Sequence, residues 1–237
     1  MRLIPRTVIS VVKSTFRMIF ADPKITLDSM NYDDYYETRK DPENISGGIP
    51  KRYSFFEKLV NSGSTVLDIG CGNGNLLEYI EEKKNTSSYG YDIAQTSVKR
   101  AQAKGVNAKV ADITDKNFKV EGVYDYIILS ETIEHIAQPE VLLKKIADSF
   151  KKEILISIPN VAYFAYRLRL LLGKFPIQWE LHPGEHLRFW SIPDFIRWAG
   201  EMGYKVKKYY VCDGFPYLEK VAPNLFGSSI LYVLVKK

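Results

Sequence analysis

The fold is decided by the stretch Val66-Leu67-Asp68-Ile69-Gly70-Cys71-Gly72-Asn73-Gly74-Asn75. The apolar run over 65–69 stops at Gly70 and predicts a buried strand. A helix is expected over 75–83, directly after the glycine-rich loop. Glycines let a backbone approach a ligand closely, and the first N–H groups of a helix lack partners inside the helix. A strand, a glycine loop and a helix in this order predict a ligand crevice at the carboxyl end of a parallel strand.

Strand-like and helix-like segments continue to alternate after this loop. Strands are expected over 89–93, 108–111, 124–130 and 154–158, and helices over 97–104 and 140–150. This alternation predicts right-handed βαβ units and a doubly wound α/β domain with a mostly parallel sheet. Helices over 163–172 and 192–202 and strands over 204–212 and 230–235 follow. The last two strands could form an antiparallel hairpin at the sheet edge.

The composition is that of an ordinary globular chain. It has 237 residues, of which 46% are hydrophobic and 26% charged. Cys71 and Cys212 give no disulfide framework and favour a reducing compartment, so a cytoplasmic location is expected. His135, His182 and His186 form no zinc-type pattern with cysteine, so no metal is expected.

The net charge of +5 is concentrated at the N-terminus. Residues 1–30 hold five basic and two acidic side chains, which is +3, so residues 31–237 hold 28 basic and 26 acidic side chains. A main domain this close to neutral gives no argument for nucleic-acid binding. We therefore divide the chain into a basic amphipathic N-terminal helix over 1–30 and one domain over 31–237.

The N-terminal helix has two open interpretations. Arg6, Lys13 and Arg17 share one face at helical spacing, between Pro5 and Pro23, which could open and close the helix. The helix could pack on the domain, or residues 1–22 could make a peripheral contact with an anionic membrane. Its longest charge-free run is six residues, which is too short to span a bilayer.

The charges around the glycine loop indicate which ligand it holds. A dinucleotide fingerprint, Gly-x-Gly-x-x-Gly, needs its third glycine at the position of Asn75. Asp68 would repel a pyrophosphate but suits a ligand with an ammonium and a sulfonium group. These two features favour S-adenosylmethionine over NAD, and so disfavour an NAD-dependent oxidoreductase.

Two further carboxylates stand at predicted strand ends. Asp92, 22 residues after Gly70, suits the ribose hydroxyls of a nucleoside, or it could cap the next helix. Asp112 with Ile113 could offer adenine an acceptor and an apolar wall, or Asp112 could only hold a turn.

These motifs, with 124–130, resemble the successive motifs of class I S-adenosylmethionine-dependent methyltransferases over about residues 63–160. The resemblance implies a seven-stranded, Rossmann-like sheet with a reversed last strand. It also implies a set of cofactor-binding residues: Asp68, Gly70, Cys71, Gly72, Gly74, Asp92, Ile93, Asp112, Ile113, Ser130 and Glu131.

The C-terminal half resembles a narrower group. Ile158-Pro159-Asn160, the stretches 167–173 and 224–227, His186-Leu187 and Asp213-Gly214 look like the MetW-type group of methionine biosynthesis. That resemblance implies an accessory role in homoserine acylation, with an acyltransferase partner and little methyl transfer. The segment 131–136 instead resembles ubiquinone-pathway and other small-molecule O-methyltransferases, which favours an active transferase.

Methyl transfer to a hydroxyl requires alignment of the acceptor and removal of its proton. His135 and His186 have the right ordinary pKa for a general base, although both could be structural. The expected acceptor is a small molecule, such as a metabolite, a sugar or a lipid-linked substrate. Residues 160–190 are expected to form a lid and acceptor region. The helix over 163–172 could be a lid helix with solvated arginines, or it could present a lipid-linked acceptor at a membrane together with the N-terminal helix. Tyr32, Tyr35 and Tyr36 could be a lid over the cofactor or packing aromatics, and Asn160 could orient the acceptor or hold a turn.

Overall fold

The computed structural model of the chain describes residues 6–22, 24–38, 49–179 and 181–237. Pro5 and Pro23, which were expected to bound the N-terminal helix, lie outside these ranges. The helix itself, α1, runs from Arg6 to Phe20. The division of the chain at residue 30 stays a prediction.

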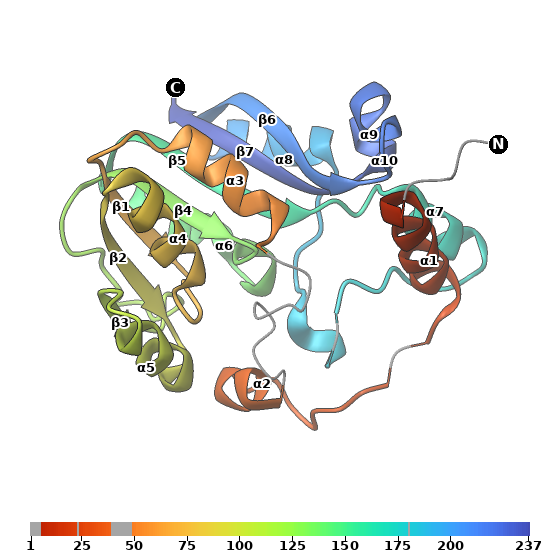
Figure 1. Cartoon of the computed structure of the whole chain (residues 1–237), viewed down its shortest axis with the longest axis horizontal. Helices are drawn as coiled ribbons and strands as arrows, with labels where there is room; N and C mark the ends of the chain where they lie inside the picture. The colour runs from red at the N-terminus through yellow and green to blue at the C-terminus, as the bar shows by residue number, and fades with distance from the viewer. Residues whose placement is uncertain (1–5, 23, 39–48, 180) are drawn as a thin grey trace.

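A seven-stranded sheet forms the centre of the molecule (Figure 1). Its strands are β1 (Thr65–Ile69), β2 (Ser87–Asp92), β3 (Ala108–Val110), β4 (Tyr124–Ser130), β5 (Phe150–Pro159), β6 (Tyr204–Gly214) and β7 (Gly227–Lys236). They lie in the order β3-β2-β1-β4-β5-β7-β6, and β7 runs antiparallel to both of its neighbours. The predicted fold class, the hairpin at the sheet edge and the reversed last strand are therefore confirmed.

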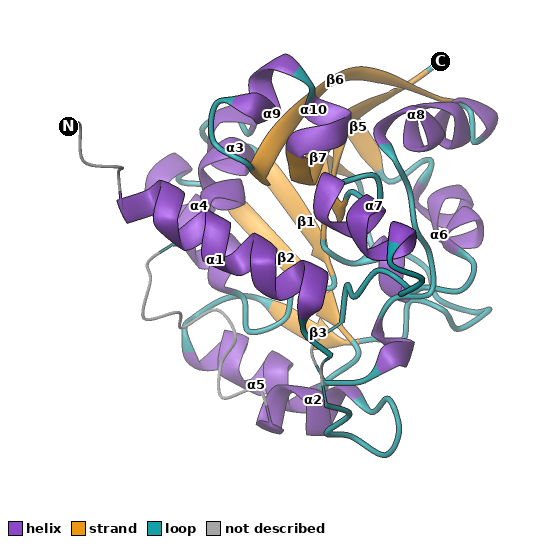
Figure 2. Cartoon of the chain, turned by 90° about the vertical axis from the view of Figure 1, so that its right-hand side faces the viewer, coloured by secondary structure: helices purple, strands orange, loops and turns teal. Residues whose placement is uncertain are grey.

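Helices cover both faces of the sheet (Figure 2). The helices in the described ranges are α1 (Arg6–Phe20), α2 (Tyr32–Thr38), α3 (Lys51–Leu59), α4 (Asn75–Lys84), α5 (Gln95–Ala103), α6 (Pro139–Ile146), α7 (Phe164–Leu171), α8 (Ile192–Glu201), α9 (Leu218–Val221) and α10 (Pro223–Phe226). Two short 3₁₀ helices, η1 (Ile133–His135) and η2 (Pro183–Glu185), lie in loops. Helices α6 and α8 pack on one face, and α3, α4 and α5 pack on the other.

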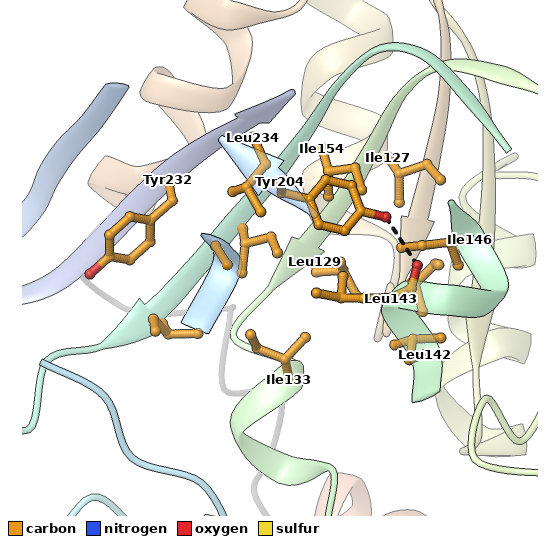
Figure 3. Packing of buried hydrophobic residues seen from close by; sticks show 14 of the residues in the cluster. Ile127, Leu129, Ile133, Leu142, Leu143, Ile146, Ile154, Tyr204, Tyr232 and Leu234 are labelled. Carbon is orange, nitrogen blue, oxygen red and sulfur yellow. Dashed lines mark hydrogen bonds between the residues drawn. The ribbon is translucent and has the colours of Figure 1, made fainter. Parts of the chain in front are cut away.

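The alternation of side chains along the strands gives two buried cores, one on each face. In β4, Ile127 and Leu129 point to the face covered by α6 and α8, whereas Ile128 points to the face covered by α4. Figure 3 shows the first of these cores, where Tyr204 donates a hydrogen bond to the Leu143 carbonyl oxygen at 3.0 Å. This bond satisfies a hydroxyl that would otherwise be buried without a partner.

The helix expected over 140–150 is shorter than the sequence predicted. It ends at Ile146, and Phe150 is the first residue of β5, paired with Tyr124. The prediction extended too far because Phe150 continues the helical spacing of Leu143 and Ile146. Phe150 reaches the same core as these residues, but it does so from a strand.

Helix α1 packs along α7 at one end of the molecule (Figure 2). Ile19 is buried there with Tyr163 and Tyr166, and the Thr15 and Tyr163 hydroxyls are 3.1 Å apart. On the exposed side, Phe16 and Phe20 keep more than half of their surface in solvent. The packing interpretation of α1 therefore describes one face of the helix, and its exposed side carries Phe16 and Phe20 together with Lys13 and Arg17.

Arg169 of α7 corrects the expectation that the arginines of this helix are solvated. Only 4% of its surface is exposed, because its guanidinium donates to the backbone carbonyl oxygens of Ile19, Ala21 and Phe175. Within the described ranges, no helix has both the length and the apolar character needed to cross a bilayer.

Candidate functional site

A cavity of about 880 Å³ opens at the carboxyl ends of the parallel strands. Its lining includes every residue predicted to bind the cofactor except Gly74: Asp68, Gly70, Cys71, Gly72, Asp92, Ile93, Asp112, Ile113, Ser130 and Glu131. Both predicted catalytic residues, His135 and His186, line the same cavity. The structure thus brings together side chains that are more than 100 positions apart in the sequence.

The glycine loop between β1 and α4 takes a backbone shape that few other residues allow. Gly70 and Gly72 have φ values of 84° and 52°, in the left-handed region. A Cβ atom at Gly70 would come within 2.7 Å of Thr132, and one at Gly72 within 2.9 Å of the Tyr36 hydroxyl. Glycine at these positions keeps the cavity wall thin, as a closely approaching ligand requires.

Asp92 at the end of β2 holds this loop in place. One of its carboxylate oxygens accepts a hydrogen bond from the Gly72 N–H at 2.8 Å, and the other accepts from the Ala94 N–H at 2.9 Å. Burial raises the pKa of Asp92 above its ordinary value, and these two backbone donors oppose that rise. Asp92 is not the N-cap of α5, which is Ala94, although it accepts from the N–H of that residue. It lines the cavity, and its ribose contact stays a prediction.

Gly74 serves packing within the structure. It has a φ of 73° at the start of α4, and a Cβ there would come within 2.8 Å of the Ala101 side chain on α5. Helices α4 and α5 can therefore approach each other closely because Gly74 has no side chain. The predicted contact of Gly74 with the cofactor stays a prediction.

Asp112 and Ile113 lie at the far side of the cavity, after β3. One oxygen of Asp112 accepts hydrogen bonds from the Thr114 N–H at 2.8 Å and the Thr114 hydroxyl at 2.6 Å. The turn role weighed for Asp112 is therefore present, beside an exposed carboxylate at the cavity wall. Ile93, half-exposed at 45%, offers an apolar surface near the end of β2.

Glu131 follows β4 in an unusual conformation. Its φ is 53°, which places a non-glycine residue in the left-handed region and stores strain. Its backbone N–H donates to the Ser157 carbonyl oxygen at 3.0 Å, and its carboxylate accepts from the Ser229 hydroxyl at 3.1 Å. These bonds fix Glu131 at the cavity wall beside Ser130.

The two predicted catalytic histidines are in contact. The ring centroids of His135 and His186 are 4.6 Å apart, nearly perpendicular to each other. Nδ1 of His135 lies 2.5 Å from the Glu185 carbonyl oxygen. Because a carbonyl oxygen can only accept, Nδ1 donates and Nε2 carries the lone pair of the neutral ring.

The Glu134 carboxylate lies close to the rings of His135 and His186. The sequence analysis gave Glu134 no role. It is 1% exposed, and neither of its carboxylate oxygens has a hydrogen-bond partner among the residues that the structure describes. Burial, and next the charge of Glu131, raise the pKa of Glu134 well above its ordinary value. A buried carboxylate in this state marks a functional position more often than a structural one.

Segments before the sheet close one side of the cavity. Tyr32, Tyr35 and Tyr36 of α2 line it, and so do Arg17 and Met18 of α1. Helix α2 is fixed on the start of α5, where the Thr96 N–H donates to Asp33 at 2.8 Å. The three tyrosines therefore form part of the cavity wall, and their role as a lid stays a prediction.

The region 160–190 also lines the cavity, through residues that include Tyr166, Gln178, Trp179 and Glu185. Of the roles weighed for Asn160, holding a turn is the one seen: its side chain donates to the carbonyl oxygens of Asn224 and Gly227 and accepts from the Ala162 N–H. Asn160 does not line the cavity.

The sequence analysis missed Glu134, Glu185 and Tyr166. For Glu134 the sequence carried one signal, its place directly before His135, and for the other two it carried none.

Methyltransferases and a MetW-type protein are among the known proteins whose sequences are similar to this chain. A (S)-tetrahydroprotoberberine N-methyltransferase of Eschscholzia californica is 30% identical over 112 residues, covering 44% of this chain and 31% of the relative. A bifunctional methionine biosynthesis protein MetXA/MetW of Rhodopirellula baltica is 26% identical over 167 residues, covering 61% of this chain and 26% of the relative. The chain thus spans less than a third of the length of these relatives.

A solved structure shows the same fold. The SAM-dependent methyltransferase from Thiobacillus denitrificans, in complex with S-adenosyl-L-homocysteine, matches with a TM-score of 0.57 and 14% identity. The match covers 89% of this chain and all of that one. At this identity, the similarity concerns the arrangement of strands and helices.

The family model described as "Methionine biosynthesis protein MetW" matches residues 51–234. The matched range begins with α3 and ends in β7, so it contains six whole strands of the sheet and most of β7, the glycine loop and every residue predicted to act in the site. On this match, which covers most of its length, the chain belongs to the MetW family.

Proposed function

We propose that the chain is an S-adenosylmethionine-dependent methyltransferase that transfers the methyl group to a hydroxyl oxygen of a small molecule. One observation carries this proposal. A single cavity is lined by the glycine loop, by the carboxylates at the ends of β1, β2 and β3, and by His135 and His186. This arrangement offers a nucleoside site and an acceptor site that share one space.

The cofactor is argued from charge. Asp68, at 2% exposure, and Asp92, at 6%, are buried acidic residues at the wall beside the glycine loop. A cofactor with a pyrophosphate would meet two carboxylates there, whereas an ammonium group, a sulfonium and ribose hydroxyls are favourable partners for them. The fold shared with methyltransferases supports this choice of cofactor.

The oxygen acceptor is argued from the groups that could move its proton. A hydroxyl must lose a proton near the transition state, and this requires a base or another means of activation. Burial raises the pKa of Tyr32 and that of Tyr166 to about 12, so these phenols stay protonated at neutral pH. Of the other groups at the cavity wall, we propose the histidines as the base, because Nε2 of His135 is the nitrogen with a lone pair.

Calorimetry and a transfer assay test the proposal together. The full chain should bind S-adenosylmethionine and S-adenosylhomocysteine, and it should not bind NAD. Incubation with S-adenosylmethionine and a panel of phenols, sugars, lipid-linked alcohols and amines should yield S-adenosylhomocysteine only with hydroxyl acceptors. Binding of NAD alone would overturn the choice of cofactor, and methylation of amines alone would overturn the choice of acceptor.

The accessory role in homoserine acylation has two observations in its favour, the membership of the MetW family and the similarity to a bifunctional MetXA/MetW protein. The similarity to that bifunctional protein is weak, and the cavity keeps the residues proposed for the cofactor and for the acceptor. A pull-down with a homoserine acyltransferase tests this second function. Capture of the acyltransferase by a chain that produces no S-adenosylhomocysteine would favour it over methyl transfer.

A further inference from the structure

We propose that Glu134, His135 and His186 form a binding site for one divalent transition-metal ion at the acceptor end of the cavity. Each of the three residues offers one ligand atom, and these atoms lie within 4.8 Å of one another. Ligand atoms bound to one such ion at about 2.0–2.2 Å are separated by somewhat less than this, so a small movement of the side chains suffices to close the site.

The state of Glu134 is the first argument. A carboxylate that is 1% exposed and has no hydrogen-bond donor on either oxygen, among the described residues, is strongly unfavourable in its charged form. Arg52 lines the same cavity, and its charge lowers the pKa of Glu134, against the larger effect of burial. A divalent cation supplies the missing partner, because buried charges in proteins are paired or bound to metals.

The orientation of His135 is the second argument. Its Nδ1 donates to the Glu185 carbonyl oxygen, which leaves the lone pair on Nε2. Metal-binding histidines commonly make this kind of bond, since it fixes the ring and the tautomer in which the other nitrogen can bind a metal. Glu185 is itself held by the N–H groups of Leu181 and His182, at 2.6 and 2.9 Å.

The backbone holds the two halves of the site together without a metal. Glu134 and His135 belong to η1, and His186 follows η2, about 50 positions later in the chain. The Glu134 carbonyl oxygen accepts hydrogen bonds from the N–H groups of Leu187 at 2.8 Å and Arg188 at 3.1 Å. The three ligands are therefore positioned by the fold, as a preorganised site requires.

The donor set indicates the kind of ion. Two imidazoles and one carboxylate suit zinc, manganese, iron or cobalt better than calcium or magnesium, which prefer oxygen ligands only. Cys71 and Cys212 are buried, and neither belongs to the cluster. Three protein ligands leave at least one coordination position of the ion open. Because the cluster lines the cavity, a molecule bound in the cavity can occupy that coordination position.

The role of the ion rests on the proposed function. A hydroxyl oxygen bound to a divalent ion loses its proton at a much lower pH than it does in water. The ion would therefore orient the acceptor hydroxyl and favour its deprotonation, and neither histidine would need to act as the base. The metal site would therefore narrow the proposed acceptors to molecules whose hydroxyl oxygen can bind a metal ion.

Metal binding is measured on the full chain, without reference to activity. Protein treated with a chelator and then dialysed is titrated with Zn²⁺ and with Mn²⁺ by calorimetry, and with Co²⁺ by visible absorption. We expect one ion per chain and the absorption bands of Co²⁺ bound to nitrogen and oxygen. Glu134→Gln and His186→Ala should each weaken binding by about 100-fold or more, since even the partners of metal ligands contribute 10–100-fold.

His182→Asn is the matched control. His182 precedes η2 and accepts from the Gly184 N–H, but it does not line the cavity, and asparagine keeps an acceptor there. This variant should bind the metal like the unchanged chain. If the unchanged chain binds none of the three ions, or if Glu134→Gln and His186→Ala bind them unchanged, the metal site is wrong.

Calorimetry with S-adenosylhomocysteine on the metal-free chain separates the two proposals. Nucleoside binding without metal binding overturns the metal site and leaves the methyltransferase proposal intact. Metal binding without nucleoside binding supports the metal site and contradicts the proposed function. Circular dichroism of the variants confirms that lost binding does not come from a lost fold.

Discussion

The Arg169 guanidinium of α7 donates a hydrogen bond to the Ile19 carbonyl oxygen of α1, with 3.0 Å between Nη1 and the oxygen. The same nitrogen donates to the Ala21 carbonyl oxygen at 2.8 Å. These carbonyl groups lie at the end of α1, where a helix leaves its acceptors without internal partners. A single buried side chain therefore caps the N-terminal helix and joins it to the helix after β5.

Replacing this arginine should detach α1. We expect Arg169→Ala to lower the free energy of unfolding by about 2–3 kcal/mol, because hydrogen bonds to a buried charged group are lost and their acceptors stay buried. Urea unfolding measures the change, and limited proteolysis reports whether α1 becomes accessible. Arg167→Ala, on the exposed side of the same helix, should change stability by less than about 0.5 kcal/mol. Equal effects of the two variants would contradict this account.

Asp92 should be required for nucleoside binding. Asp92→Ala removes a charged acceptor for two ribose hydroxyls, so the affinity for S-adenosylhomocysteine should fall by about 100-fold or more in calorimetry. Asp115→Ala is the control, because Asp115 holds a similar turn, through the Asn117 N–H, outside the cavity. Normal binding by Asp92→Ala would show that the nucleoside site is misplaced.

Gly74 and Gly105 allow the packing role of a glycine to be separated from its backbone role. Both have positive φ values, 73° and 85°, but a Cβ at Gly105 meets nothing within 4 Å, whereas one at Gly74 meets Ala101 at 2.8 Å. Gly105→Ala should lower stability by about 1 kcal/mol through backbone strain alone. Gly74→Ala should lower it by about 1–3 kcal/mol more. Denaturant unfolding of both variants measures the difference, and equal losses would remove the packing role.

Asp125 should contribute to the acid sensitivity of the fold. Hydrogen bonds from Thr65, the N–H first, lower the pKa of Asp125 below its ordinary value of 3.8. A lowered pKa means that the stabilising contribution is complete above the unfolded value and is lost as the pH falls through the folded value. Asp125→Asn should therefore be less stable than the unchanged chain at neutral pH, and the difference should shrink below about pH 4. Urea unfolding at both pH values measures this, and a constant difference would contradict it.

The open face of α1 bears on the expected membrane contact. Phe16 and Phe20 are 64% and 51% exposed, with ring centroids 4.5 Å apart, and Lys13 and Arg17 are exposed on the same helix. We expect the chain to bind vesicles with anionic lipids in a salt-sensitive manner. Phe16→Ser combined with Phe20→Ser should weaken binding by roughly tenfold or more, as expected for the loss of two buried aromatic rings. Equal binding by a chain that lacks residues 1–28 would remove the membrane contact.

The sequence predicted the sheet because its signals are local. Val66 to Ile69 form an apolar run, the glycines mark the loop, and Asp92 stands at the next strand end. Each of these signals lies within a few residues, and the parallel fold then brings the strand ends to one edge. The ligand cavity therefore followed from short-range patterns and one rule of topology.

The acceptor end did not follow from such patterns. Glu134 and His186 are 52 positions apart, and they meet only because the loop after η2 donates two backbone hydrogen bonds to the Glu134 carbonyl oxygen. Arg169 shows the same limit, since its amphipathic helix suggested a solvated charge, whereas the structure places α1 over it. Contacts between distant loops depend on tertiary packing, which periodicity does not encode.

The walls of the cavity come from two parts of the chain, one inside the range of the family match and one before it. The glycine loop and the strand-end carboxylates lie within the range 51–234 that the family shares, whereas α1 and α2, which close one side, precede it. Sequence differences in α1 and α2 can change which molecules enter the cavity, while the glycine loop and the strand-end carboxylates stay the same. Two homologues with nearly identical cores can therefore differ in the molecule that they modify, and substrate inference across the lineage should be drawn from the leading helices as well as from the shared core.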